Sequence, residues 1–136
     1  MSWDADLVVE IDGHEIVVGD WNFTHNTNGM IRKVLDVAGI DYASKWIGSG
    51  VRYKPGEPPT PFTDEPIGNW YHALSGEPGP SPVLETIVAG LMEAPSLFRS
   101  MNPPNGWGDY DSLLAVLVEM RDQGREYPSA RWRTSG

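Results

Sequence analysis

The N-terminal part of the chain alternates between apolar and polar residues with a period of two. Leu7–Ile11 and His14–Val18 are rich in β-branched residues, and Asp12-Gly13 separates them. This pattern predicts two antiparallel strands joined by a two-residue turn, because Asp and Gly both tolerate the positive φ that such a turn requires.

Two further segments show the same alternation. Residues 20–25 place Trp21, Phe23 and His25 on one face, and we interpret them as a third strand that is joined to the second through Gly19. Residues 129–134, near the C-terminus, also alternate and predict a further strand.

Apolar residues at spacings of three and four predict amphipathic helices farther along the chain. The first predicted helix follows Asn26–Asn28, which are good N-cap residues, and ends at Gly39. The second begins at Ser81-Pro82, a cap residue followed by proline, and ends at Pro95. Residues 96–101 are expected to add one or two helical turns.

The third predicted helix begins after Asp109 and ends at Gly124. These elements together predict a single α+β domain over residues 1–136. A small antiparallel sheet, made of the N-terminal β-hairpin plus one or two strands, is expected to pack against about three helices. A proline-rich irregular excursion is expected at residues 41–81, with a short helix near residues 67–74.

Composition narrows the classes of function. The 136 residues carry a net charge of -9, which argues against binding duplex nucleic acid or an anionic membrane surface, since both need a basic footprint. The absence of cysteine excludes disulfides and thiol chemistry. We find no apolar run of membrane-spanning length and no signal-peptide pattern, so we expect a soluble protein in the cytoplasm.

Two loops concentrate small polar side chains next to predicted helices. Neutral donors and acceptors of this kind suit a polar ligand, and rigid loops that carry aromatic residues suit recognition. The alternative, which the residue types of the first loop favour, is that these side chains satisfy backbone groups where a helix begins. The candidate binding residues are Asn22, Thr24, Asn26 and Asn28 in the first loop and Asn102, Asn105, Trp107 and Tyr110 in the second.

An enzymatic alternative would use His25, Asp109 or Asp111 as acid or base. Both aspartates fall at the start of a predicted helix, where a negative charge is stabilising, so we favour helix capping over catalysis. The three histidines are too far apart in the sequence for a local metal motif, and we expect neither a metal nor a cofactor.

The sequences of the two polar loops also resemble motifs found in other proteins. Residues 22–30 match Asn-x-Thr-x-Asn-x-[Ser/Thr/Asn]-x-Met, and residues 102–110 match Asn-Pro-x-Asn-Gly-Trp-Gly-Asp-Tyr. About half of the chain thereby resembles a group of small uncharacterised proteins of actinobacterial phages and bacteria. The resemblance implies a phage or prophage accessory protein, in the host cytoplasm if phage-encoded, and supplies no catalytic residue.

We therefore expect a non-catalytic, phage-type accessory binding protein that engages a host protein or a small polar or nucleotide-like ligand. A small enzyme with its site between the two loops is one alternative; a deep pocket there with a titratable group at its floor would favour it. A virion or assembly component, with Trp46 or Trp70 on its interface, is the other. The identity of the partner, the oligomeric state and the role of residues 41–81 are left open.

Overall fold

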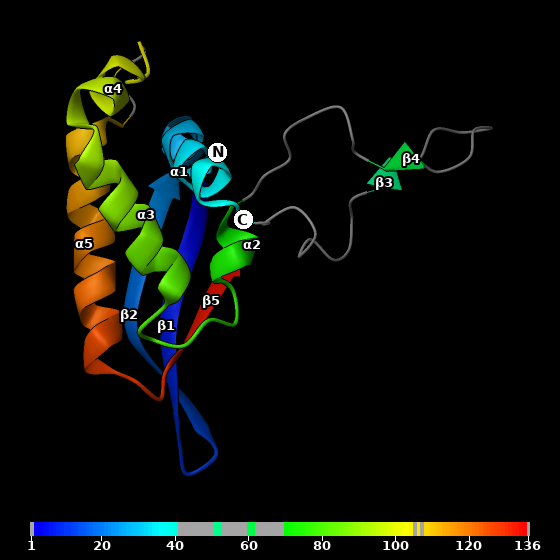
Figure 1. Cartoon of the computed structure of the whole chain (residues 1–136). Helices are drawn as coiled ribbons and strands as arrows, with labels where there is room; N and C mark the ends of the chain where they lie inside the picture. Colours follow the sequence, from blue (N-terminus) through cyan, green and yellow to red (C-terminus); the bar gives the residue numbers. More distant parts are fainter. Residues whose placement is uncertain are drawn as a thin grey trace.

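The computed structural model describes residues 2–40, 51–52, 60–61, 70–104, 106 and 108–135. A small antiparallel sheet packs against helices in the α+β arrangement that the sequence predicts (Figure 1). In chain order the elements are β1 (Ser2–Ile11), β2 (His14–Thr24), the 3₁₀ turn η1 (His25–Thr27), α1 (Asn28–Ala38), β3 (Val51–Arg52), β4 (Thr60–Pro61), α2 (Tyr71–Leu74), α3 (Pro82–Glu93), α4 (Pro95–Ser100), α5 (Tyr110–Glu126) and β5 (Arg131–Ser135).

The main sheet has three strands in the order β2-β1-β5, and every pairing is antiparallel. The predicted hairpin is confirmed: Asp12 and Gly13 form its turn, with φ of 52° and 77°. The predicted C-terminal strand is also confirmed as β5, which pairs with Asp4–Val8 of β1. The hairpin turn projects beyond the helices (Figure 1).

The prediction of a separate third strand at residues 20–25 is wrong, because β2 runs without interruption to Thr24. Leu7 pairs with Gly19 whereas Val8 pairs with Val17, so Val18 is an extra residue in β2, a β-bulge. The bulge shifts the alternation by one residue and turns the following side chains, Trp21 and Phe23, towards the helices. Gly19 itself lies beneath the Trp21 ring, which would overlap a Cβ atom at this position.

The core is built around a cluster of aromatic rings from β1, β2 and α2, which Asn28 of α1 joins by hydrogen bonds. The Trp3 ring stacks on Phe23 at 4.3 Å and on Tyr71 at 5.0 Å, and it meets Trp70 edge-on at 4.9 Å. The side-chain oxygen of Asn28 accepts hydrogen bonds from the indole nitrogens of Trp3, at 3.3 Å, and Trp70, at 3.2 Å. Trp70 is fully buried, so the hypothesis that it lies on an assembly interface is wrong; Trp46 lies outside the described residues.

Most of the predicted helix boundaries are confirmed. Ser81 caps α3 by accepting from the backbone N–H of Leu84, Gly39 ends α1 in the left-handed conformation, and α4 supplies the further turns expected after Pro95. The short helix expected near residues 67–74 is confirmed for Tyr71–Leu74. Of the proline-rich excursion, residues 41–50, 53–59 and 62–69 lie outside the described residues.

Helix α5 continues past Gly124, which was predicted to end it, and stops at Glu126. Gly124 is instead a contact point. A Cβ atom there would overlap the backbone carbonyl of Gly79, and one at Gly79 would overlap the carbonyls of Tyr127 and Gly124. The two glycines therefore allow the segment before α3 to touch α5 directly, backbone against backbone.

Replacing Gly124 with alanine tests this contact. We expect G124A to lower the free energy of unfolding by roughly 1–3 kcal/mol, because neither backbone can move aside cheaply. G29A is the matched control: the nearest atom to the new Cβ lies at 3.9 Å, and alanine favours the helix by up to about 1 kcal/mol. Urea denaturation measures both. Equal stabilities of the two variants would contradict the proposed contact.

Replacing Asn28 with alanine tests the link between the two tryptophans. N28A leaves two buried indole N–H groups without their acceptor, at about 1–3 kcal/mol for each, so we expect a loss of several kcal/mol in urea denaturation. N22A makes the same truncation at an exposed position and should change stability by only about 0.5 kcal/mol. A loss of similar size in both variants would refute the special role of Asn28.

Candidate functional site

The two polar loops that the sequence singles out meet in the fold. Gly108, at a φ of 88°, approaches the first loop so closely that a Cβ atom there would lie 2.9 Å from the Thr24 methyl carbon and 3.1 Å from that of Thr27. The hollow between them measures about 130 Å³, and Asp109 supplies the one carboxylate among its described lining residues. The loops therefore contact each other around a hollow too small for most substrates.

Side chains of the first loop hold local structure. Asn22 donates to the Asp4 carboxylate at 2.7 Å, on the outer face of the sheet. Thr24 accepts from the backbone N–H of Asn26 at 3.2 Å, which shapes the turn into η1. Asn28, also predicted to bind ligand, is 5% exposed and lies in the aromatic core. The structure thus divides these four residues among three places: the outer face, the turn and the core.

The second loop uses its polar groups in the same way. Asn102 accepts from the backbone N–H of Tyr110 at 2.8 Å, and the Tyr110 hydroxyl donates to the Leu91 carbonyl at 2.6 Å. Tyr110 is 1% exposed, and its ring packs against Phe98 and the Arg99 guanidinium. The Tyr110 ring is therefore covered by the protein itself and not displayed to a ligand.

Two of the predicted binding residues, Asn105 and Trp107, lie outside the described residues, and their role in binding stays a prediction. The side chain of His25, a candidate acid or base, is outside them as well. Whether these three side chains take part in the contact between the two loops is therefore not decided by the described residues.

The two aspartates of the enzymatic alternative are held by neighbouring groups. Asp109 accepts from the backbone N–H of Ser112 at 2.7 Å and caps α5, as predicted. Asp111 accepts from Arg99 at 2.9 and 3.3 Å. These hydrogen bonds lower the pKa of the Asp111 carboxyl, desolvation partly opposes the lowering, and the positive charge of Arg99 adds to it. A carboxylate with a lowered pKa is a poor proton acceptor at neutral pH.

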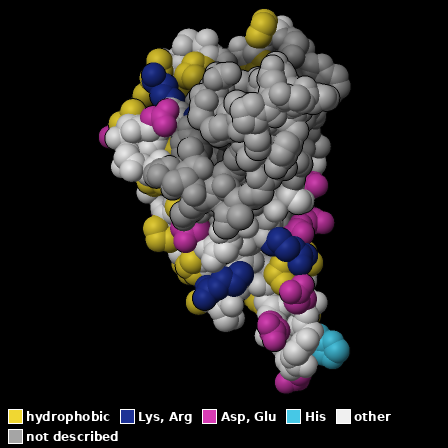
Figure 2. Space-filling model, turned by 90° about the vertical axis from the view of Figure 1, so that its right-hand side faces the viewer, with side chains coloured by type: hydrophobic (Ala, Val, Ile, Leu, Met, Phe, Trp, Pro, Cys, Tyr) yellow, Lys and Arg dark blue, Asp and Glu magenta, His cyan; other side chains and the backbone are white. Residues whose placement is uncertain are grey.

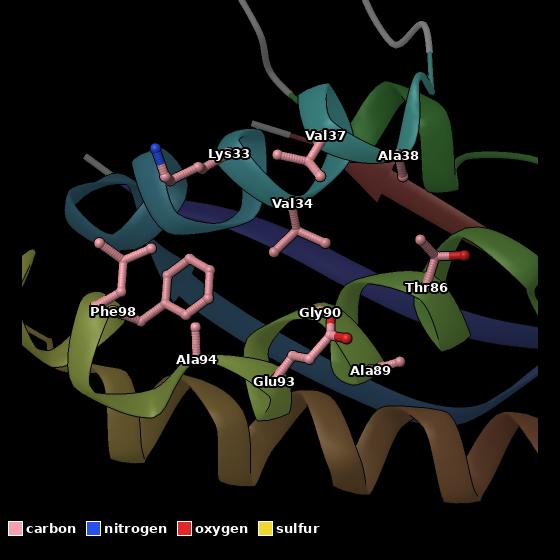
Figure 3. A pocket seen from close by; sticks show the side chains of 11 residues that line it. Lys33, Val34, Val37, Ala38, Thr86, Ala89, Gly90, Glu93, Ala94 and Phe98 are labelled. Carbon is pink, nitrogen blue, oxygen red and sulfur yellow. The ribbon is translucent and has the colours of Figure 1, made fainter.

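A larger hollow than the one between the polar loops lies elsewhere, between α1 on one side and α3 with α4 on the other (Figure 3). Its volume is about 630 Å³, and most of the side chains that line it are apolar. We call it the α1–α3 groove. It is lined by Lys33, Val34, Val37, Ala38, Thr86, Ala89, Gly90, Glu93, Ala94, Leu97 and Phe98.

Small residues create the α1–α3 groove. Gly90 lets α3 touch α1, because a Cβ atom at this position would overlap the side chain of Val34. The short side chains of Ala89 and Ala94 leave space unfilled on the α3 side of the groove (Figure 3). Two large apolar side chains of the lining are left in solvent: Val37 is 84% exposed and Leu97 is 45% exposed.

Sequence reasoning missed the α1–α3 groove, although the chain carries an indication of it. In the first predicted helix, Met30, Ile31, Val34, Leu35 and Ala38 recur at spacings of three and four, and Val37 is an apolar residue outside this stripe. An apolar residue beside the buried stripe of a helix widens its apolar face beyond what the core covers. Leu97, on α4, is exposed in the same way. Only the packing of the helices shows that the two residues border one hollow.

Charged residues flank the α1–α3 groove from opposite sides. Lys33 lies on α1 and Glu93 on α3 (Figure 3). Both are exposed, and neither forms an ion pair with another described residue. The one hydroxyl of the described lining, that of Thr86, already donates to the Pro82 carbonyl at 2.8 Å. The α1–α3 groove is thus apolar between a positive and a negative flank.

The outer face of the sheet is charged. Arg133 on β5 binds Asp6 at 3.4 Å and Glu15 at 3.0 Å, so the basic C-terminal segment meets the acidic N-terminal hairpin. Figure 2 shows basic and acidic side chains interspersed towards the end where the hairpin turn projects. Within the described part of the chain, no three His, Asp or Glu residues are grouped so that they could hold a metal ion.

The pair formed by Arg99 and Asp111 can be tested by titration. Because the folded-state pKa of Asp111 is lowered, the pair favours the folded state above the ordinary Asp pKa, and this contribution is lost as the pH falls through the lowered value. We expect R99Q to raise the pKa of Asp111 towards its ordinary range in an NMR titration. R121Q, whose arginine pairs with Asp122, is the control and should leave it unchanged. An unshifted Asp111 in R99Q would contradict the assignment.

None of the helices in the described ranges is both long and apolar enough to cross a membrane. Comparison of the chain with protein-family models, with curated proteins and with solved structures finds no match.

Proposed function

We propose that this chain is a non-catalytic binding protein that holds an apolar segment of a partner protein in the α1–α3 groove. The observation that carries the proposal is the exposure of Val37 and Leu97 on either side of an apolar hollow of about 630 Å³. Burying a large apolar side chain is worth roughly 1.5–3 kcal/mol. The α1–α3 groove therefore offers a partner binding energy that the isolated chain does not use.

The shape and lining of the α1–α3 groove favour a protein segment over a small polar ligand. Small-molecule sites enclose most of the ligand surface, whereas Val37 at the border of this groove is 84% exposed. A polar ligand would lose its hydrogen bonds to water and gain few in return from the apolar lining. The apolar side chains of a partner protein form no hydrogen bonds with water, so their burial in the groove carries no such cost.

The polar loops support binding over catalysis for a separate reason. The carboxylates of Asp109 and Asp111 and the hydroxyl of Tyr110 already bond to groups of the protein itself. The resemblance to small phage and bacterial proteins favours a host protein as the partner. Trp107, a residue that the sequence predicts to bind, is proposed as a second contact with the partner.

Charged substitutions in the α1–α3 groove test the proposal. V37R and L97R each place a charge among the apolar lining, and because both wild-type side chains are exposed, the fold should persist. We expect each variant to lose most of the partner protein that the wild-type chain retains from a host lysate. M92R is the matched control, since Met92 is an exposed apolar residue, intermediate in exposure between Leu97 and Val37, outside the groove lining.

The readout is quantitative mass spectrometry of the retained proteins, with circular dichroism to confirm folding. Retention of the same protein by V37R, L97R and M92R would show that the α1–α3 groove is not the binding surface. Turnover of a metabolite by the wild-type chain, together with no retained protein, would overturn the assignment as a binding protein.

A further inference from the structure

The walls of the α1–α3 groove indicate the backbone conformation of its occupant. An extended segment would lay backbone N–H and C=O groups against an apolar lining, where they find no partners. A helix satisfies these groups internally and presents only side chains. Helix-in-groove recognition of this kind uses apolar anchors at spacings of three and four residues.

The lining on the α3 side has the spacing of a helix surface. Thr86, Gly90 and Glu93 are four and three residues apart on α3. A second helix can lay its own side chains between such ridges. The low wall at Ala89 permits the close approach that this packing needs.

The flanks of the α1–α3 groove indicate the charges of the occupant. Lys33 and Glu93 stand on opposite walls, and no other described residue pairs with either (Figure 3). A helix lying in the groove would bring one flank of its apolar stripe to Lys33 and the other to Glu93. Opposite charges there would form two new pairs, whereas like charges would be repelled at one wall.

We infer that the α1–α3 groove binds an amphipathic helix of a partner protein, with an acidic residue on one flank of the apolar stripe and a basic residue on the other. This inference rests on the proposed function and names the partner class for the same groove. Because the flanking pairs are exposed, each should strengthen binding about two- to five-fold, and the apolar stripe should supply the rest.

Three synthetic helical peptides test the inference against the full-length chain. All share one apolar stripe with anchors at i, i+3, i+4 and i+7, and they differ in the flanks, which are Glu/Lys, Glu/Glu or Lys/Lys. Compensating residues on the far face keep their net charge equal, so that the acidity of the chain cannot decide the order. Fluorescence anisotropy at low salt should rank Glu/Lys first, several-fold tighter than the other two.

Exchanging the charges of the groove should exchange the preference. K33E makes both walls acidic and should favour the Lys/Lys peptide, E93K makes both basic and should favour Glu/Glu, and the double variant should restore Glu/Lys. R131E is the matched control for K33E, because it makes the same charge change at an exposed residue outside the groove lining. It should leave the wild-type order intact.

The outcomes separate the inference from the proposed function. Equal binding of the three peptides, lost in V37R, would overturn the charged flanks and leave the groove as a binding surface. Binding of no peptide, or binding that V37R does not weaken, would overturn both. A dimer of the chain alone in sedimentation velocity, lost in V37R, would make a second copy the occupant and would likewise overturn the inference.

Discussion

The fold depends on one carboxamide oxygen. Asn28 begins α1, and its oxygen accepts from indole groups on β1 and beside α2, so three segments distant in sequence meet at one buried acceptor. A buried indole N–H without an acceptor lowers the free energy of unfolding by about 1–3 kcal/mol. Trp3 and Trp70 are therefore buried at positions where the Asn28 oxygen can accept from both of them. The position of α1, and with it one wall of the α1–α3 groove, follows from this requirement.

The sequence predicts the parts of the fold that local chemistry decides. Asp12-Gly13, Ser81-Pro82 and Asp109 act through their own backbone and their nearest neighbours, so the turn and both caps lie where the pattern places them. The two errors in the elements concern glycines that make room for another group rather than end an element. Gly19 accommodates the Trp21 ring beside a bulge, and Gly124 accommodates Gly79, which is far from it in sequence. Local patterns cannot distinguish such glycines from glycines that end an element.

The candidate site was harder to predict for a related reason. Polar residues such as Asn28, Asn102 and Asp109 attract attention in a sequence, yet the same donors and acceptors are what a small fold needs where helices begin and where tryptophans are buried. The α1–α3 groove is made of valine, leucine and alanine, residues that any core contains. What distinguishes Val37 from a core residue is its exposure, and only the packing of the helices determines that exposure.

The close packing of α1 on α3 also explains why the α1–α3 groove is open. Gly90 brings the two helices together at Val34, so the residues beside that contact, Val37 and Ala89, diverge from each other and remain in solvent. A larger residue at position 90 would separate the helices and change the width of the hollow. The glycine that stabilises the contact therefore also sets the shape of the surface proposed to bind a partner, and stability and recognition constrain the same position.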